Sequence, residues 1–286
     1  MRVLSIPGDL PLQRRPVTER LDGIRAITFD FGNTLVPMGR AALGRVVELT
    51  ADVVTERIPG IDRAAFLVAW AEERDRQFRE EVPQFREVDI AERLVRVLAR
   101  LRGMPVPATE DRWDQVAAAR LSDAREIDLT LVAYSDAFVA ALPPTPGVGP
   151  LLERLAAERS LAILSNWPLA ATIDRYVAAH GWLPHLQAIV VSQRVGTIKP
   201  HPAIFAAARA ELGDIPPTSI LHVGDDWAAD VVGAAAAGWR TAWLAERPQD
   251  TPLPTSQRDS SVRADLELAS IGELESRLGA ITPLAG

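Results

Sequence analysis

The amino-acid sequence predicts an α/β protein in which a doubly wound parallel sheet carries an inserted all-helical cap domain. The first observation is that short apolar runs alternate with helical patterns after residue 148, which is the order of parallel βαβ units. The second is a similar apolar run far upstream, over 26–29, that stops at an acidic residue. The third is a block of about 100 residues between them whose pattern is helical throughout, long enough to form a domain.

Proline and glycine residues divide the chain. Residues 1–22 contain prolines and arginines without a hydrophobic period, and we expect an N-terminal extension there. Pro37 and Gly39 interrupt the chain after the first strand, and the proline-rich run 143–147 marks the return from the helical block. The predicted parts are therefore an extension over 1–22, a core over 23–39 and 144–286, and a cap over 40–143.

In the cap, apolar residues recur at helical spacing and no strand is expected. Asp62 is placed to act as an N-cap, and Gly103 is placed to close a later helix. The cap helices are expected over 41–58, 62–81, 89–103, 111–121 and 127–142.

In the core, each short apolar or β-branched run is expected to be a buried parallel strand, and each longer amphipathic run a covering helix. The strands are expected over 26–29, 161–164, 188–191, 219–223, 240–244 and 264–268. The helices are expected over 148–158, 169–179, 202–212, 228–237 and 271–278.

Polar groups follow several of these strands. Asp30, Ser165 and Asp225 come directly after predicted strands, and Lys199, the only lysine of the chain, lies in the loop after another. Because the carboxyl ends of parallel strands face one crevice, we expect these side chains to meet there. Paired carboxylates can hold Mg²⁺, and a lysine with a hydroxyl can hold phosphate oxygens. This combination suits phosphoryl transfer.

Each of these residues also has an ordinary structural interpretation. Asp30 could cap the following helix, and Ser165 and Asn166 are common turn formers. Asp230 could be a first-turn acid that matches a helix dipole. His222 falls inside a strand and is expected to be a core residue rather than a ligand.

Four stretches in order resemble the motifs of the haloacid dehalogenase-like (HAD) hydrolase superfamily, in its phosphatase-like branch with a helical cap after the first motif. The stretches are FDFGNTL, ILSNWP, VGTIKPHPAIF and LHVGDDWAADVVGAAAAGWRTAWL. The resemblance covers residues 24–280. It implies a Rossmann-like core and a hydrolase that acts on a small, phosphorylated molecule with Mg²⁺ as cofactor.

The resemblance also implies roles for individual residues. Asp30 would be the nucleophile that forms a covalent aspartyl intermediate, and Lys199 would neutralise charge on the nucleophile and phosphate. Ser165 would bind a phosphoryl oxygen, with Asn166 beside it facing substrate, and Thr34 would brace the turn after Asp30.

The implied metal ligands are carboxylates and one main-chain oxygen. They are Asp30, the backbone carbonyl of Gly32, and Asp225 with Asp226 or Asp230 in support.

The chain departs from the family at Gly32. Phosphatases of the superfamily usually carry there a second aspartate that acts as general acid and base, and glycine cannot transfer a proton. Two alternatives to a phosphatase stay open: a 2-haloacid dehalogenase, whose halide leaving group needs no proton, and a catalytically weakened binding protein. Phosphonate cleavage through a lysine imine is disfavoured, because residues 40–143 contain no lysine.

Composition limits the remaining functions. The 286 residues include no cysteine, which excludes disulfides and thiolate chemistry. A net charge of −7 argues against a nucleic-acid partner, and no apolar run is long enough to cross a membrane. Without a recognisable signal peptide, we expect a cytoplasmic protein.

Overall fold

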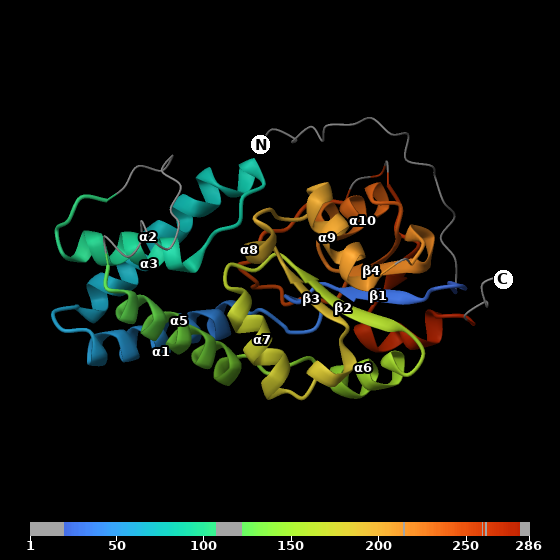
Figure 1. Cartoon of the computed structure of the whole chain (residues 1–286), viewed down its shortest axis with the longest axis horizontal. Helices are drawn as coiled ribbons and strands as arrows, with labels where there is room; N and C mark the ends of the chain where they lie inside the picture. Colours follow the sequence, from blue (N-terminus) through green and yellow to red (C-terminus); the bar gives the residue numbers. More distant parts are fainter. Residues whose placement is uncertain (1–19, 107–121, 214, 259, 261, 281–286) are drawn as a thin grey trace.

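A computed structural model describes residues 20–106, 122–213, 215–258, 260 and 262–280. Its centre is a six-stranded sheet in the order β3-β2-β1-β4-β5-β6, and every neighbouring pair is parallel (Figure 1). The strands are β1 Ala26–Phe29, β2 Ser160–Ser165, β3 Ala188–Val191, β4 Ile220–Gly224, β5 Arg240–Leu244 and β6 Leu266–Leu268. The predicted doubly wound parallel sheet is confirmed.

Helices cover both faces of the sheet (Figure 1). They are α6 Val148–Ala156, α7 Ala170–Ala179, α8 Ser192–Val195, α9 Pro202–Leu212 and α10 Gly233–Ala236. Successive strand residues point to opposite faces, so Leu161 and Ile163 join the core cluster under α6 and α7. Ala162 and Leu164 join the cluster under α9 instead. Because both faces are buried, the strands read as continuous apolar runs.

The described residues of the cap form helices joined by turns and contain no strand, as predicted. Its helices are α1 Arg40–Arg57, α2 Arg63–Glu80, a 3₁₀ turn Val82–Gln84, α3 Ile90–Leu101 and α5 Ala124–Ala141. Asp62 is an N-cap as expected, since its carboxylate accepts a hydrogen bond from the Ala65 amide at 2.8 Å. The helix predicted over 111–121 lies outside the described residues. The cap helices lie together on one side of the sheet (Figure 1).

Two helix predictions in the core differ from the structure in the type of helix. The segment predicted as a helix over 228–237 is helical, but it begins as a π-helical turn, Trp227–Val232, and continues as α10. The segment predicted as a helix over 271–278 forms two 3₁₀ turns, Ile271–Glu273 and Glu275–Arg277. Its last residue is drawn away from a helical path, because Leu278 forms a parallel bridge with Leu21.

The cap contacts the core through the segment 85–90. The amide of Ile90 donates to the Pro168 carbonyl at 3.2 Å, and the hydroxyl of Thr197 donates to the Phe85 carbonyl at 3.0 Å. Gln193 donates to the Asp89 carboxylate at 2.9 Å. Pro168 lies in the loop after β2 and Thr197 in the loop before Lys199, so the cap rests on two loops that carry predicted site residues.

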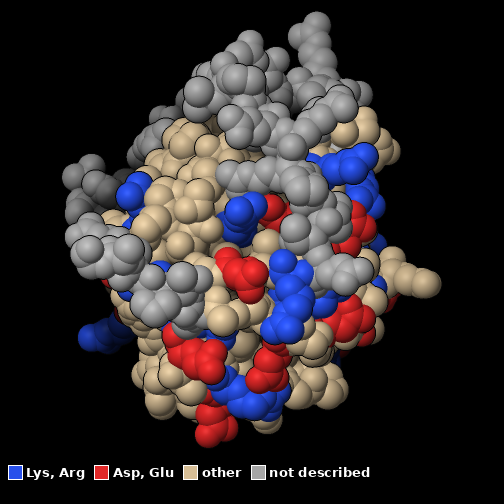
Figure 2. Space-filling view, turned by 90° about the vertical axis from the view of Figure 1, so that its right-hand side faces the viewer, with Lys and Arg blue, Asp and Glu red and all other residues tan. Residues whose placement is uncertain are grey.

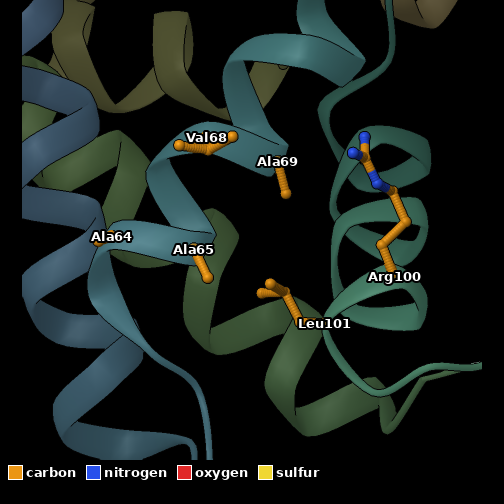
Figure 3. A pocket seen from close by; sticks show the side chains of 6 residues that line it. All are labelled: Ala64, Ala65, Val68, Ala69, Arg100 and Leu101. Atoms are coloured by element: carbon orange, nitrogen blue, oxygen red, sulfur yellow. The ribbon is translucent and has the colours of Figure 1, made fainter.

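Two surface features lie outside these loops. A shallow apolar depression between α2 and α3 is lined by Ala64, Ala65, Val68, Ala69, Arg100 and Leu101 (Figure 3). On the face of the molecule remote from the cap, acidic and basic side chains of the described residues are interspersed (Figure 2). In the part of the chain that the structure describes, no helix has the length and hydrophobicity needed to cross a membrane.

Candidate active site

Asp30 lies at the carboxyl end of β1, the strand between β2 and β4. Its amide donates to the Val223 carbonyl at 2.8 Å, which extends the sheet pairing by one residue. A tight turn follows, in which the Asn33 amide donates to the Val36 carbonyl at 2.7 Å. Asn33 has a φ of 57°, which asparagine tolerates better than most residues. The turn therefore fixes the direction of the Asp30 carboxylate, which is 8% exposed.

Lys199 is buried between two carboxylates. Its ammonium donates to Asp30 Oδ1 at 2.8 Å, to Asp230 Oδ1 at 2.6 Å and to the Leu164 carbonyl at 2.9 Å. Burial acts to lower the pKa of Lys199, but Asp230 and Asp30 outweigh it and raise the pKa above its ordinary value. Lys199 is therefore a permanent positive charge with all three of its protons engaged.

Asp225 completes a group of three buried carboxylates. Asp30, Asp225 and Asp230 each place one oxygen within 4.8 Å of the others. Burial, reinforced by the charges of Asp30 and Asp230, raises the pKa of Asp225 to about 8. Burial also raises the pKa of Asp30 to about 6, although Lys199 opposes the shift. These carboxylates need more positive charge than the side chains around them supply, and their oxygens suit a hard divalent cation.

Asp230 is the second carboxylate that holds Lys199, and it also contacts His222 and the Asp226 amide. Burial would raise its pKa, but Lys199 and His222 lower it well below its ordinary value. Its Oδ2 accepts from the Asp226 amide at 2.9 Å. The π-helical turn brings Asp230 so close to Gly224 that a Cβ there would lie 2.2 Å from the carboxylate, which leaves space only for glycine. Such turns are frequent at functional sites because they redirect a side chain.

The structure separates Asp226 from this group. Its carboxylate accepts hydrogen bonds from the Ala229 amide at 2.9 Å and from the Ser256 amide and hydroxyl at 2.8 Å each. Asp226 therefore caps the π-helical turn and fastens a loop. Its carboxylate thus already accepts three hydrogen bonds, and its support of a metal stays a prediction.

Asn166 also differs from its predicted role. Its side-chain amide donates to the Lys199 carbonyl at 3.1 Å, and its side-chain oxygen accepts from the Lys199 amide at 2.7 Å. This pair of bonds clamps the main chain of Lys199 and uses one of the two N–H donors and one of the two lone pairs of the side-chain amide. Asn166 is thus a positioning residue for the lysine.

Two predicted phosphate-site hydroxyls are buried without a partner among the described residues. They belong to Ser165 and Thr34, each 1% exposed. Buried polar groups are normally satisfied, so two unpaired hydroxyls at the strand ends fit the role of donors to a bound oxyanion. The prediction that Thr34 braces the turn is not favoured, because its hydroxyl forms no hydrogen bond with the described residues there.

Sequence reasoning does not identify His222 as part of the site. As expected it is a buried strand residue, but its Nε2 lies 3.0 Å from Asp230 Oδ1 and its Nδ1 lies 2.8 Å from the Thr28 hydroxyl. Burial lowers the pKa of His222, so the ring is neutral and can hold Asp230 by a hydrogen bond. The feature that connects His222 with the site is the register of the parallel strands β1 and β4. In this register His222 pairs with Thr28, which lies two residues before Asp30.

Sequence reasoning also misses a loop that covers the site. Residues 245–256, which follow β5 and are called the strap below, contact three parts of the site. Arg247 Nη1 lies 3.4 Å from Asp225 Oδ2, and Thr251 accepts a hydrogen bond from Asn33 at 3.3 Å. Leu253 covers Gly32, where a Cβ would lie 3.0 Å from Leu253 Cδ1. The strap thus fills the position of the missing second aspartate with an apolar side chain.

The site and the fold define a hydrolase. A family model for haloacid dehalogenase-like hydrolases matches residues 24–238, and the chain belongs to this family. Among solved structures, a 2-haloacid dehalogenase from Pseudomonas syringae pv. tomato shares the fold with a TM-score of 0.62 and 22% identity, over 89% of this chain and 97% of that one. YfnB from Bacillus subtilis, solved bound to magnesium, has a TM-score of 0.55 and 19% identity over 88% of this chain and 97% of that one.

Curated relatives match shorter parts of the chain. The pyrimidine 5′-nucleotidase YjjG of Escherichia coli is 26% identical over 51% of this chain and 61% of its own length. A phosphoserine phosphatase of Thermus thermophilus is 32% identical over 36% of this chain and 42% of its own length. The chain thus spans less than two thirds of the length of these relatives.

Proposed function

We propose that the protein is a Mg²⁺-dependent phosphatase that acts on a small phosphorylated metabolite through an aspartyl-phosphate intermediate. The observation that carries this proposal is the group of Asp30, Asp225 and Asp230 within 4.8 Å, with Lys199 bonded to two of them. The unpaired hydroxyls of Ser165 and Thr34 supply further donors for phosphate oxygens. The curated relatives support the reaction class, because they are named as a nucleotidase and phosphatases.

The donor set fits a magnesium ion. Asp30, Asp225 and the backbone carbonyl of Gly32 would hold the ion, and Asp230 would support it by fixing Lys199. When bound, the ion would neutralise negative charge on the phosphoryl oxygens. The supporting observation is that three carboxylates are buried together, where burial, reinforced by the charges of Asp30 and Asp230, raises the pKa of Asp225 to about 8.

The proposed reaction proceeds in two displacements. A carboxylate oxygen of Asp30 attacks phosphorus, and the bond from phosphorus to the leaving oxygen breaks with its electron pair on that oxygen. Water then attacks phosphorus of the aspartyl-phosphate and loses a proton to solvent, and the bond between phosphorus and the Asp30 oxygen breaks, which frees inorganic phosphate and restores the carboxylate. Lys199 holds Asp30 in position, and the hydroxyls of Ser165 and Thr34 bind the phosphoryl oxygens.

The leaving group of this reaction receives no proton from residue 32. Gly32 has no side chain, and Leu253 Cδ1 and Met38 Cγ would lie 3.0 and 3.5 Å from a Cβ at this position. We propose that substrates with acidic leaving groups are preferred, since these depart without protonation. The same feature favours the second candidate, a 2-haloacid dehalogenase, in which Asp30 would attack carbon and halide would leave.

Metal removal separates the two candidates. With 4-nitrophenyl phosphate, whose leaving group is acidic, we expect turnover with Mg²⁺ and its loss in excess chelator. Asp225→Asn should weaken Mg²⁺ binding by about tenfold or more in calorimetry, because the ion loses a charged oxygen ligand. Metal-independent chloride release from 2-chloropropionate would instead establish the dehalogenase, and inactivity on both compounds would contradict both candidates.

Position 32 offers a test of the leaving-group argument. Gly32→Asp alone should raise the rate on phosphate esters only slightly, because Leu253 already fills the space beside residue 32. The same crowding should destabilise the fold by about 1–3 kcal/mol. With Leu253→Ala added, the acid has room, and the rate on alkyl phosphates should rise by about 10²-fold, with a smaller gain on aryl phosphates. The measurement is the slope of log kcat/KM against leaving-group pKa, with Leu253→Ala as the control.

An unchanged slope in a folded double variant would show that protonation at this position does not limit the enzyme.

A further inference from the structure

The strap is fastened at its C-terminal end and in its middle, and it contains three prolines. The Ser256 hydroxyl donates to Asp226 and accepts from the Ala228 amide at 2.6 Å, and Asp250 accepts from the Arg40 amide at 3.2 Å. Three of its residues, Pro248, Pro252 and Pro254, have a fixed φ. Proline restricts the unfolded chain, so an ordered loop that contains prolines loses less conformational entropy on folding. The strap can therefore hold its side chains in place at a small cost in free energy.

Arg247 is the cation that the strap brings to the site. Its Nη1 lies 3.4 Å from Asp225 Oδ2, and Asn33 donates to the same oxygen at 3.4 Å. Its Nη2 is buried and has no hydrogen-bond partner among the described residues. A buried guanidinium nitrogen without an acceptor is costly, so its place is explained best by an acceptor that arrives with a ligand.

With a magnesium ion bound, the charges of the site suit an anionic ligand. In that state the carboxylates are ionised, so Asp30, Asp225 and Asp230 contribute three negative charges, and Lys199 and Arg247 contribute two positive charges. A magnesium ion changes the net charge of the site from −1 to +1, and a bound phosphate monoester dianion then returns the net charge to −1. Without Arg247 the loaded site would stand at −2, which would oppose substrate binding.

Asp225 links Arg247 to the proposed nucleophile. Asp225 has an oxygen within 4.8 Å of an oxygen of Asp30, the proposed nucleophile, and Arg247 lies 3.4 Å from Asp225. A phosphoryl group attacked by Asp30 would thus lie within reach of the second guanidinium nitrogen. Arginine suits this contact because its planar fork can bond a carboxylate and a phosphate oxygen together.

We propose that Arg247 contacts substrate, and that its Nη2 donates a hydrogen bond to an oxygen of the phosphoryl group. This inference rests on the proposed phosphatase function and adds a specificity-determining residue from outside the four family motifs. The strap has a double effect: Leu253 removes the space for a general acid, while Arg247 supplies positive charge to the group being transferred.

The test is the affinity for inorganic phosphate, measured by calorimetry on the full chain at saturating Mg²⁺. Arg247→Gln should weaken phosphate binding by about 10- to 100-fold, the loss typical of one charge-assisted hydrogen bond. Arg247→Lys should lose less phosphate affinity than Arg247→Gln, because lysine keeps the positive charge. The Mg²⁺ affinity of Arg247→Gln should be no weaker than that of the wild type, which separates phosphate contact from damage to the metal site.

Two control variants separate a phosphate contact from the general loss of an arginine and from loosening of the strap. Arg154→Gln removes an exposed arginine paired with Glu275 at 3.0 Å, and it should bind phosphate as the wild type does. Ser256→Ala loosens the strap but keeps Arg247. If Ser256→Ala loses as much phosphate affinity as Arg247→Gln, the arginine only fastens the strap and the inference is overturned.

Other outcomes are equally decisive. Wild-type phosphate affinity in a folded Arg247→Gln protein would overturn the inference while the phosphatase assay stands. A wild type that binds phosphate but does not hydrolyse 4-nitrophenyl phosphate would overturn the proposed function, and calorimetry alone would then decide the Arg247 contact. A wild type that neither binds nor hydrolyses would overturn both.

Discussion

Replacing Asp30 by asparagine is expected to reduce kcat on 4-nitrophenyl phosphate by on the order of 10⁴-fold or more, because the amide cannot act as the nucleophile. The two side chains have nearly the same shape. The side-chain oxygen of an asparagine can also still accept the hydrogen bond from the Lys199 ammonium, which spans 2.8 Å in the wild type. The variant should therefore keep its fold, with a thermal unfolding midpoint near that of the wild type.

The decisive measurement is a single-turnover reaction with radiolabelled phosphate ester, in which the wild type should carry label on the protein after acid quenching. Asp30→Asn should carry none. Asp62→Asn is a matched control, because it makes the same change at an exposed carboxylate that accepts the Ala65 amide in the cap, away from the strap. If Asp30→Asn retains turnover and labelling, the nucleophile is another residue.

Replacing Lys199 by arginine is expected to lower kcat/KM by about 10²–10³-fold, although the positive charge is retained. The ammonium bonds Asp230, Asp30 and the Leu164 carbonyl within 2.6–2.9 Å in a space that is 2% exposed. A guanidinium is wider and planar, so it would displace the carboxylates that it is meant to hold. Stability should fall as well, since a disturbed buried ion pair typically costs about 3–5 kcal/mol.

Kinetics on 4-nitrophenyl phosphate and urea unfolding test this expectation together. The reverse exchange at the surface, Arg154→Lys, is the control, because its partner Glu275 is exposed and tolerates either cation. Full activity in Lys199→Arg would mean that the lysine contributes charge alone and that its shape is irrelevant.

The elements that can be identified from the sequence are those determined by local pattern. Continuous apolar runs specify strands buried on both faces, and all six strands lie close to their expected positions. The meeting of Asp30, Lys199 and Asp225 also follows, because parallel strands must end at one edge of the sheet.

The parts of the site that cannot be identified from the sequence depend on which partner each polar atom finds. Asn166, expected to face substrate, instead binds the main chain of Lys199, 33 residues away. Asp226, expected beside the metal, instead caps a helix and fastens Ser256. Two adjacent aspartates have the same composition and charge, so only their surroundings in the folded chain separate the roles of Asp225 and Asp226.

The strap escapes prediction for a related reason. It has no hydrophobic period, and it reaches the site through contacts with residues far away in sequence, such as that between Thr251 and Asn33. The π-helical turn resembles an ordinary helix in sequence, because its alanine and valine residues fit either form. That this turn is π-helical becomes apparent only in the folded chain, where it places the Asp230 side chain against Gly224.

Because Lys199 is the only lysine in 286 residues, the chain carries a spectroscopic probe at its candidate nucleophile without any engineering. Protein grown with isotopically labelled lysine would give one side-chain ammonium signal in a nuclear magnetic resonance spectrum. That signal would come from a group hydrogen-bonded to Asp30, Asp230 and the Leu164 carbonyl. Its chemical shift would report the binding of magnesium and of phosphate, each added separately, and its hydrogen exchange rate would report exposure of the crevice to solvent. Because there is only one such signal, no resonance assignment is needed.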